Sequence, residues 1–348
     1  MKTRKKKVRY FLENLLNQKE YYLPGLFWKG ALEEIAKNYI DKGIDNFRRE
    51  DINLQFFVPT YGCPGNGFNK KEISHIFSQN FDSLSIKQNS YLQKSLDGSL
   101  HALSDYRTFK AATLLSDLYG LSNFSESDVG NPTEKFSFHN KFFSRSSLNY
   151  LLGLTFLNAL AHDFRPKTVL EIGGGFGTLA EILEQSNLLK FKYINLDLPP
   201  MFLISEAYME ACSQKNEDFF DYFKNIDGSV NICDLPKFTF LPNWRIEDLQ
   251  GKIDLFVNYI SFQEMEPFIV ENYIKHILRL KPEFVLLRNL REGKQKSKKG
   301  VLGVQKPLLK QDYLHYFSSY KLLGSNTIPY GYKTVDGFHS ELMILKKK

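Results

Sequence analysis

A glycine-dense turn is the part of this 348-residue chain whose residue types are best suited to binding a cofactor. It reads VLEIGGGFGTL over residues 169–179, with a strand-like apolar run before the glycines and a helix-like run after them. Glycine is needed where the backbone turns sharply and where a ligand lies so close that a Cβ would collide with it. We therefore expect the four glycines to line a cofactor, the alternative being a tight turn without a ligand. They are Gly173, Gly174, Gly175 and Gly177.

The charge next to these glycines indicates which cofactor is bound. Glu171 stands two residues before Gly173, at the end of the predicted strand. A loop that holds a dinucleotide places a pyrophosphate at the N-terminus of the following helix, where a nearby carboxylate would repel it. S-adenosylmethionine has no phosphate, and its ammonium and sulfonium groups are cations. Glu171 therefore favours S-adenosylmethionine over a nicotinamide cofactor, and so does the GxGxG spacing in place of GxGxxG.

A second carboxylate follows the next predicted strand. Asp197 comes directly after the apolar run 192–196 and lies 20 residues beyond Gly177 (197 − 177). That is about the offset at which an acid reaches the ribose hydroxyls in nucleotide-binding folds. We expect Asp197 to bind the ribose, unless it is an ordinary surface aspartate.

Alternating strands and helices would bring these residues together. From Ser144 onward, a helix-like stretch precedes a series of apolar, strand-like runs that have helix-like stretches between them. The predicted strands are 167–172, 192–196, 254–259, 284–287 and 341–345. This alternation predicts an α/β fold with a doubly wound, Rossmann-like and mostly parallel sheet, in which ligands bind beyond the carboxyl ends of the strands.

Before residue 144 the pattern is different. Helix-like spacing at 11–16, 31–40 and 106–119 alternates with segments rich in Gly, Pro and Asn, and the two prolines and two glycines within 56–65 exclude a helix there. We therefore divide the chain into a helical and irregular N-terminal region at 1–143, which is a candidate substrate cap, and a cofactor-binding domain at 144–348.

Three motifs resemble those of a known family. EIGGGFG at 171–177 resembles motif I of class I S-adenosylmethionine-dependent methyltransferases, and NLDLPP at 195–200 resembles the acid-Leu-Pro element of small-molecule O-methyltransferases. SFQEM at 261–265, shortly after an asparagine, resembles an element of the bacterial sugar O-methyltransferases. Together with the segments at 56–62 and 130–132, the resemblance covers most of the chain.

The resemblance implies a fold, a cofactor and an acceptor. The fold is a methyltransferase sheet of the seven-strand type with an antiparallel last strand. The cofactor is S-adenosylmethionine, with Glu171 at its amino-acid end, Asp197 at its ribose and Leu198 beside its adenine. The acceptor is a sugar hydroxyl in a glycan, a nucleotide sugar or a glycosylated metabolite, as in polysaccharide or secondary-metabolite biosynthesis.

Methyl transfer to an alcohol is an in-line displacement that needs a positioned base, because alcohols are weak acids. Gln263 and Glu264 lie just past the predicted strand 254–259, at a place where plant small-molecule O-methyltransferases carry a His-Asp pair. The histidine is absent here. We therefore expect Glu264 to be the base and Gln263 to position the hydroxyl. The alternative for Glu264 is a carboxylate at the start of the next helix, where the helix dipole favours it.

Four further side chains are candidates for contacts to the acceptor. Arg288 and Asn289 follow the fifth predicted strand at the same sheet edge and would clamp hydroxyls or phosphate, the alternative being a solvated loop. Tyr61 and Tyr330, like Tyr332, stand in glycine-flanked loops and offer aromatic surfaces for a sugar, although aromatic residues more often belong to a core.

The amino-acid composition argues against a membrane-spanning, a disulfide-rich or a metal-binding protein. The chain is 43% hydrophobic and 24% charged, which is typical of a soluble globular protein, and no run approaches the roughly 20 apolar residues that span a bilayer. Three separated cysteines indicate neither a disulfide framework nor a CxxC site, and the seven histidines lack HxxxH and HxE spacing, so we expect no dedicated metal site. No apolar segment follows the basic N-terminus, so we expect a cytoplasmic location.

The net charge of +7 raises the question of nucleic acid. Lysines cluster at 5–7, 294–299 and 346–348, but none of these clusters interleaves aromatic residues as RNA-binding motifs do. Nucleic acid is therefore not the expected partner, and a phosphorylated or lipid-linked sugar would suit the same charge. The alternatives are an RNA or other small-molecule methyltransferase, an NAD(P)-dependent oxidoreductase, and an inactive module that binds S-adenosylmethionine.

Overall fold

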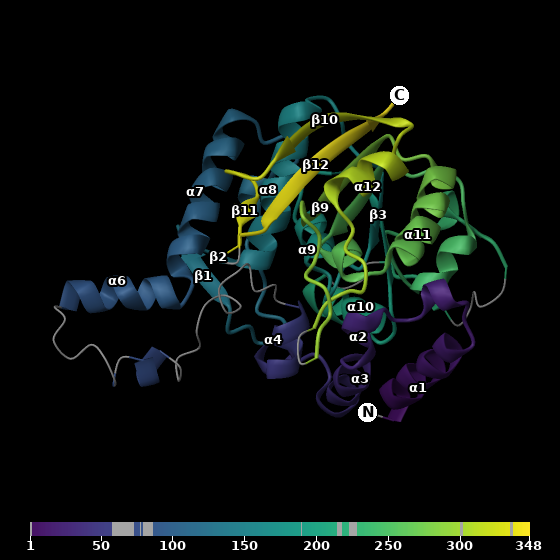
Figure 1. The fold of residues 1–348 in the computed structure, drawn as a ribbon, viewed down its shortest axis with the longest axis horizontal. Coiled ribbons are helices and arrows are strands. Elements are labelled where there is room, and N and C mark those ends of the chain that lie inside the picture. Colours follow the sequence, from purple (N-terminus) through teal and green to yellow (C-terminus); the bar gives the residue numbers. More distant parts are fainter. Residues whose placement is uncertain are drawn as a thin grey trace.

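The computed structural model describes residues 2–57, 73–76, 78, 86–188, 190–213, 218–222, 228–299, 302–334 and 337–348. Its centre is an eight-stranded sheet with the order β10-β12-β9-β8-β3-β4-β6, in which β11 pairs with β12 (Figure 1). These strands are β3 Thr168–Ile172, β4 Lys192–Asp197, β6 Phe238–Pro242, β8 Leu255–Tyr259, β9 Phe284–Leu290, β10 Tyr320–Asn326, β11 Tyr332–Lys333 and β12 His339–Lys347. Strands β6, β4, β3, β8 and β9 pair in parallel, and β12 runs antiparallel to each strand that it pairs with. The predicted fold class is confirmed.

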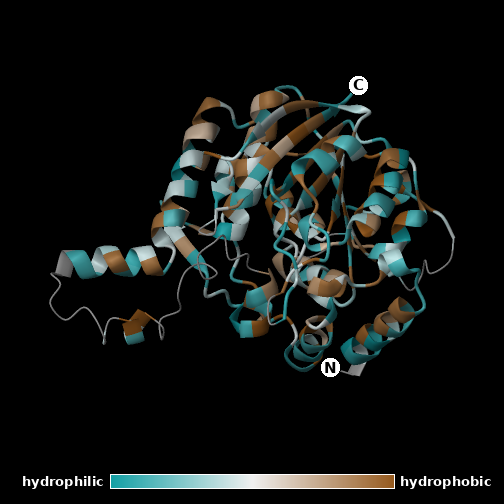
Figure 2. Cartoon of the chain, viewed as in Figure 1, coloured by the Kyte–Doolittle hydropathy of each residue, from teal (hydrophilic) through white to brown (hydrophobic). Residues whose placement is uncertain are grey.

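Helices cover both faces of this sheet. Successive residues of β3 point to opposite faces, as in any strand, and they belong to two different buried clusters. Val169 packs with residues of α8, α9 and α10, whereas Leu170 packs with residues of α11 and α12. The helices are α8 Arg145–Leu160, α9 Thr178–Glu184, α10 Met201–Cys212, α11 Pro267–Leu280 and α12 Lys310–Tyr316. The strands between the two layers are largely hydrophobic (Figure 2).

A capping box at Ser144 fixes the N-terminal end of helix α8. The Ser144 hydroxyl accepts the backbone N–H of Ser147 at 3.1 Å, and the Ser147 hydroxyl accepts the N–H of Ser144 at 3.1 Å. This reciprocal pair satisfies two of the N–H groups that a helix start leaves without partners. The helix therefore begins at Arg145, within the helix-like stretch expected from Ser144 onward, and carries Ser146 and Asn149 on its first turns.

The N-terminal region is mainly helical and packs onto the same core as α8 to α10. Val8, Phe11 and Phe47 belong to the first buried cluster together with residues of β3 and α10. The elements are α1 Lys2–Leu16, α2 Leu26–Lys29, α3 Leu32–Lys42, α4 Asp51–Phe57, α6 Ile86–Leu96, α7 Ser99–Leu115, β1 Lys135–Phe138 and β2 Lys141–Ser144. Helix α6 extends away from the rest of the molecule (Figure 1). The boundary at 143/144 falls inside β2, one residue before its end, and the division into two domains stays a prediction.

A buried ion cluster also joins the N-terminal region to the sheet domain. Arg48 is buried and forms ion pairs of 2.5 Å with Glu126 and with Glu134. Its guanidinium carbon lies 4.7 Å from the centre of the Phe176 ring, in the glycine turn. Contacts from the N-terminal region therefore reach the segment that the sequence assigns to the cofactor.

Smaller elements complete the described chain. Short parallel strands pair β5 Val230–Asn231 with β7 Leu249–Gln250. The 3-10 helices are Glu20–Tyr22, Phe47–Arg49, Leu121–Asn123, Ile232–Asp234, Asn243–Glu247 and Ser261–Glu264. Within the described ranges, every helix is too short or too polar to cross a bilayer.

Candidate active site

A cavity of about 700 Å³ opens at the carboxyl ends of β3, β4 and β8. Its walls come from the loops that follow these strands, from α2 and α4 of the N-terminal region, and from the segments between β9 and β12. This is the edge of a doubly wound sheet at which ligands bind. The fold therefore brings together, around one cavity, loops that lie far apart in the sequence.

The glycine turn forms one wall of the cavity. Gly173 has φ +73°, and a Cβ there would run into the Ser261 side chain. A Cβ on Gly174 would lie 2.7 Å from Glu171 Oε2 and 2.8 Å from Asn195 Oδ1. Gly173, Gly174 and the adjacent Gly175 line the cavity, and their contact with a cofactor stays a prediction.

Gly177 occupies a different position. It does not line the cavity, and a Cβ there would lie 3.5 Å from the Tyr208 ring of α10. With φ +106° it also adopts a conformation that L side chains rarely take. Gly177 thus allows the backbone to turn and α9 to pack closely against α10, whereas Gly173, Gly174 and Gly175 face the cavity.

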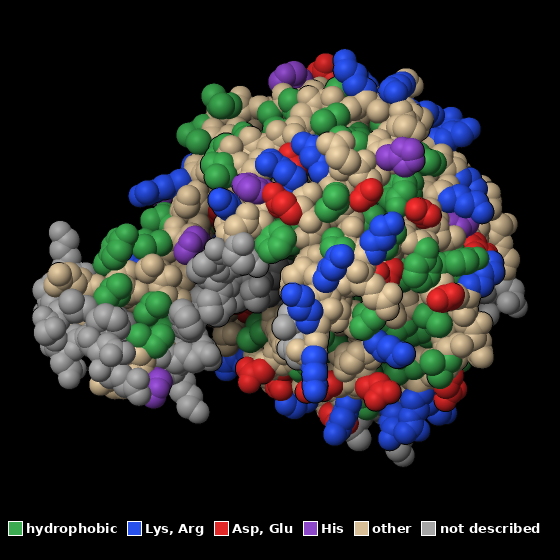
Figure 3. All heavy atoms as spheres, viewed as in Figure 1, with side chains coloured by type: hydrophobic (Ala, Val, Ile, Leu, Met, Phe, Trp, Pro, Cys, Tyr) green, Lys and Arg blue, Asp and Glu red, His purple; other side chains and the backbone are tan. Residues whose placement is uncertain are grey.

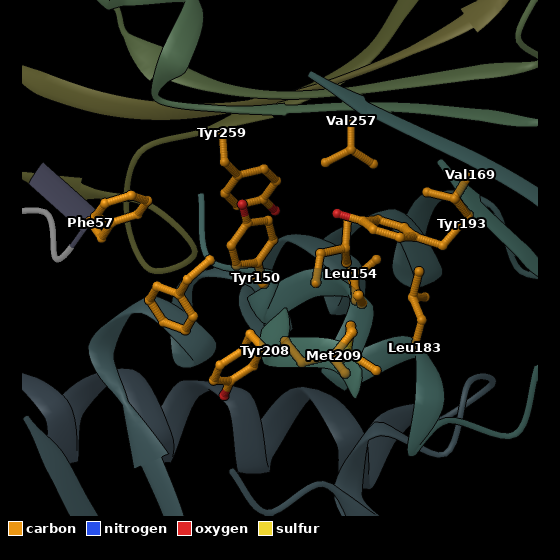
Figure 4. Packing of buried hydrophobic residues seen from close by; sticks show 14 of the residues in the cluster. Phe57, Tyr150, Leu154, Val169, Leu183, Tyr193, Tyr208, Met209, Val257 and Tyr259 are labelled. Carbon is orange, nitrogen blue, oxygen red and sulfur yellow. The ribbon is translucent and has the colours of Figure 1, made fainter. Parts of the chain in front are cut away.

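Glu171 lies beneath the glycine turn rather than on the cavity surface. Its side chain is completely buried, and its two oxygens accept hydrogen bonds from Tyr150, at 2.7 Å, and from Tyr193. Figure 4 shows these tyrosines reaching toward the same region from α8 and β4. Burial raises the pKa of Glu171 to about 7, and the two tyrosine hydroxyls act in the opposite direction. Its charge would reach a ligand through the thin glycine backbone without direct contact.

Asp197 faces the cavity at the end of β4. Its Oδ2 accepts the N–H of Gly175 at 3.2 Å, and its Oδ1 accepts the N–H of Leu198 at 2.7 Å. Burial raises the pKa of Asp197 to about 7, although both backbone donors lower it. Asp197 and Leu198 both line the cavity, next to the glycine turn. The second acid is therefore tied to the first motif by a hydrogen bond.

The segment after β8 brings Gln263 and Glu264 to the cavity. Ile260 has φ +70°, which is a strained conformation for a β-branched residue, and it turns the chain into the 3-10 helix Ser261–Glu264. The Asn258 amide holds this turn against the end of β3 by donating to the Ile172 carbonyl at 3.0 Å. Strain of this kind persists only where the surroundings fix it, and it is common at functional sites.

The two side chains have different partners. Gln263 Oε1 accepts the N–H of Leu290 at 2.7 Å, and its amide nitrogen makes no hydrogen bond to the described residues. Glu264 Oε1 forms an ion pair of 2.8 Å with Lys294, and both residues line the cavity. Because α11 begins at Pro267 with Glu266 as its N-cap, Glu264 is not the residue that starts this helix.

Lys294 is a site residue that the sequence did not reveal. The lysine cluster at 294–299 suggests an exposed loop, but the ammonium of Lys294 lies 4.3 Å from the centre of the Phe27 ring, inside the cavity mouth. Lys294 lies four residues after the end of β9. Its position just beyond the carboxyl end of a strand could have identified it as a candidate site residue from the sequence.

Arg288 and Asn289 lie inside the wall of the cavity and do not line it. Strand β9 extends to Leu290 and buries both side chains, so they do not belong to a solvated loop. Arg288 donates to Asn149 Oδ1 and to the Tyr330 carbonyl, and Asn289 donates to Asn258 Oδ1 at 3.2 Å. The expectation that Arg288 and Asn289 clamp the acceptor directly is therefore wrong, because both side chains lie behind the cavity surface.

The aromatic candidates divide in the same way. The Tyr330 ring packs against Phe156 with a centroid distance of 5.1 Å and does not line the cavity, whereas Tyr332 does. Tyr61 lies outside the described residues. The main aromatic wall comes instead from α2 and α4, where Trp28 and Phe56 have their ring centres 5.3 Å apart. Sequence reasoning missed this wall because these helices are distant in sequence from every motif.

Within the described part of the chain, no group of three or more His, Cys, Asp or Glu side chains is placed to hold a metal ion. The candidate site is therefore described by its protein side chains: two carboxylates at the glycine turn, a carboxylate–lysine pair at the mouth, and aromatic walls.

No protein-family model and no curated protein matches the sequence. Solved structures do match. The mitomycin 7-O-methyltransferase MmcR is 15% identical over 59% of this chain and 55% of its own, with a TM-score of 0.39. The magnesium protoporphyrin IX methyltransferase ChlM from Synechocystis PCC 6803, with bound S-adenosylmethionine, is 11% identical over 59% of this chain and 81% of its own, with a TM-score of 0.39. The neocarzinostatin O-methyltransferase NcsB1 is 10% identical over 59% and 58%, with a TM-score of 0.36.

The chain thus spans only about half of the length of MmcR and of NcsB1. At this level of identity and TM-score, the matches do not determine the cofactor or the acceptor of this protein. Those assignments depend on the chemistry of the cavity.

Proposed function

We propose that this protein is an S-adenosylmethionine-dependent methyltransferase. The observation that carries the proposal is the charge around the glycine turn, where Glu171 lies directly beneath the backbone and Asp197 lies beside it. Among the described residues that line the cavity, the only cation is Lys294, and it is paired with Glu264. A cationic nucleoside is attracted to such a site, whereas the diphosphate of a dinucleotide would lie at the glycine turn, against these two carboxylates.

Calorimetric titration of the protein with four ligands tests this step. S-adenosylmethionine and S-adenosylhomocysteine are expected to bind, and NAD⁺ and NADP⁺ are expected not to bind under the same conditions. Binding of a nicotinamide nucleotide without binding of S-adenosylmethionine would replace the methyltransferase by an oxidoreductase.

We further propose that the acceptor is a sugar hydroxyl of a glycan, nucleotide sugar or glycosylated metabolite in the cytoplasm. The mouth of the cavity combines aromatic faces from Phe27, Trp28 and Phe56 with the amides of Gln55 and Gln295. Aromatic faces pack against the C–H surfaces of a sugar, and amides bind its hydroxyls. On the face in Figure 3, basic side chains are interspersed with acidic ones, which does not favour nucleic acid as the acceptor.

In this proposal Glu264 is the general base. Lys294 holds Oε1 of Glu264 at 2.8 Å, and Oε2 has no hydrogen-bond partner among the described residues, so it is available to accept the hydroxyl proton. The acceptor oxygen forms a bond to the methyl carbon while the bond from that carbon to the sulfonium sulfur breaks. S-adenosylhomocysteine leaves as a neutral thioether, and the proton is left on Glu264. Gln263 contributes its amide nitrogen to orient the hydroxyl.

Glu264→Gln separates catalysis from cofactor binding. The variant is expected to lower methyl transfer by about 10²–10⁴-fold, the range of general-base contributions, with unchanged affinity for S-adenosylmethionine. The matched control is Glu271→Gln, which makes the same change on the exposed face of α11 and should leave both quantities unchanged. A fully active Glu264→Gln variant would remove Glu264 as the base. Transfer of isotope-labelled methyl groups to candidate glycans, followed by mass spectrometry, identifies the acceptor; labelling of RNA alone would contradict the sugar assignment.

A further inference from the structure

A polar recess lies on the side of the cavity formed by α8, β8, β9 and β11. It is lined by Ser146 and Asn149 of α8, Tyr259 of β8 and Tyr332 of β11. The guanidinium of Arg288 lies directly behind it, in contact with Asn149. We call these five residues the donor recess, because each of them carries an N–H or O–H group.

Three of these donors are buried and have no hydrogen-bond partner among the residues that the structure describes. The Ser146 hydroxyl, the Asn149 amide nitrogen and the Tyr259 hydroxyl are shielded from solvent and make no hydrogen bond to the described residues. Ser146 is 6% exposed, Asn149 2% and Tyr259 5%, so bulk water does not satisfy them. More than 90% of buried polar groups are hydrogen-bonded, and the Tyr259 hydroxyl packs against Gly153 of α8, so the two unpartnered donors of Ser146 and Asn149 indicate a ligand that accepts hydrogen bonds.

The charge of the recess points to an anion. The Arg288 side chain is fully buried, and its two hydrogen bonds go to neutral oxygens, those of Asn149 and of the Tyr330 carbonyl. No carboxylate of the described residues forms an ion pair with it. The rings of Tyr259 and Tyr332, at 5.7 and 5.3 Å, offer only partial compensation. Buried charges are normally paired, so a negative group is missing.

The neighbouring elements do not cancel this charge. Arg145, at the start of α8, is a second buried cation, and its ion pair with Asp105 at 3.3 Å accounts for one negative group. The N-terminus of α8, capped at Ser144, adds the positive end of a 16-residue helix dipole. Among the described charges facing the recess from α7, α8 and β9, positive charge is therefore in excess.

Across a pair of stacked tyrosines the sign of the charge reverses. Figure 4 shows the rings of Tyr150 and Tyr259 next to each other. Their centres are 4.2 Å apart and the interplanar angle is 23°, so the rings stack. Tyr259 belongs to the recess, and the Tyr150 hydroxyl donates to Glu171. A cationic group and a carboxylate thus flank the same aromatic pair, which is the arrangement that would receive the carboxylate and the ammonium of an amino acid.

We propose that the donor recess binds the α-carboxylate of S-adenosylmethionine, with Ser146 and Asn149 donating to it and Arg288 balancing its charge from behind Asn149. This inference rests on the proposed function, since it assigns the amino-acid end of the same cofactor. It also gives Arg288 a role that its buried position allows, as a positioning residue that acts through Asn149.

The Asn149→Asp variant should fold normally and lose its affinity for the carboxylate of S-adenosylmethionine. The aspartate keeps the oxygen that accepts from Arg288 and supplies the missing counter-charge, so the ligand-free variant should melt at or above the temperature of the wild type. It also replaces a donor by an anion, which repels a carboxylate. Asn149→Leu is the second variant, because it removes the donor without adding charge.

The readout is the ratio of two affinities measured by calorimetry without acceptor. Decarboxylated S-adenosylmethionine keeps the ammonium and the sulfonium and lacks only the carboxylate. The wild type should bind S-adenosylmethionine roughly tenfold or more tighter than the decarboxylated form, as expected for losing a charge-assisted hydrogen bond. Asn149→Asp should abolish or reverse this preference, and Asn149→Leu should reduce it.

Gln55→Glu is the matched control, because it adds the same charge to the cavity lining from α4, outside the recess. It should change both affinities alike and keep their ratio. Equal binding of the two donors by the wild type, or an unchanged ratio in Asn149→Asp, would overturn the inference and leave the recess to an anion on the acceptor. Failure of the proposed function has a different signature, since neither donor would then bind.

Discussion

Affinity for a cationic methyl donor should fall as the pH is lowered below about 7. Burial raises the pKa of Glu171 and that of Asp197, each to about 7, so both carboxyls hold protons in mildly acidic solution. A bound cation favours the ionised carboxylates, and binding must expel these protons. Each group then lowers the affinity by roughly tenfold for each pH unit below its pKa, so both together cost up to roughly 100-fold between about pH 6.5 and 5.5.

Acidification does not unfold the protein through these two groups. Their pKa values are raised above the reference values of 4.5 for Glu171 and 3.8 for Asp197, so the folded state binds these protons more tightly than the unfolded chain. Their contribution to stability is fully present below those reference values and is lost as the pH rises through about 7. A loss of affinity between about pH 6.5 and 5.5 therefore reports on the site rather than on unfolding.

Calorimetry in two buffers of different protonation enthalpy measures both the affinity and the number of protons released. 5′-Methylthioadenosine, which carries neither cation but keeps the ribose, is the comparison ligand, and its affinity should show only the part of the pH dependence that belongs to Asp197. Glu171→Gln is the control variant, because the hydroxyls of Tyr150 and Tyr193 can rotate to match an amide. This variant should lose the share of the proton release that belongs to Glu171. Constant affinity for S-adenosylmethionine over this window, without proton exchange, would refute the reasoning.

Three further perturbations have definite outcomes. Asp197→Ala should weaken binding of S-adenosylmethionine by roughly tenfold or more in calorimetry, because the ribose loses its charged acceptor; unchanged affinity would mean that the ribose lies elsewhere. Arg48→Met should lower the free energy of unfolding by about 3–5 kcal/mol in urea titrations, since Glu126 and Glu134 remain buried without their shared cation; a change of only a few tenths would contradict that role. Deletion of residues 2–7 should leave methyl transfer unchanged, because residues 3–7 are exposed or half-buried and do not line the cavity; a large loss of turnover would give this basic segment a function.

The central sheet could be predicted from the sequence because its strands are buried on both faces. Strands β3, β4 and β8 are short apolar runs, and their observed bounds differ from the predicted ones by one residue. Helix α10, Met201–Cys212, lies among the helix-like stretches expected between the predicted strands 192–196 and 254–259. Strand β10 was missed because it is an edge strand whose residues are mostly half-buried, so it lacks a clear apolar run.

The site could be predicted only in part. The glycine turn and Asp197 are local signals, since strand ends and turn residues follow one another in the sequence. The burial of Arg288 depends on Asn149, 139 residues earlier, and the aromatic wall depends on α2, so neither has a local signal. Glu171 was expected to contact the cofactor, but the hydroxyls of Tyr150 and Tyr193 hold it beneath the turn. Long-range contacts of this kind are fixed by the fold and leave no periodic pattern.

A crystal structure with S-adenosylhomocysteine would test the central claim most directly, because it locates each part of the ligand. We predict the ribose hydroxyls within hydrogen-bonding distance of Asp197, the adenine near Leu198, and the sulfur directed toward Glu264. An unoccupied cavity at saturating ligand, or a nicotinamide nucleotide with its diphosphate at Gly173–Gly175, would contradict it.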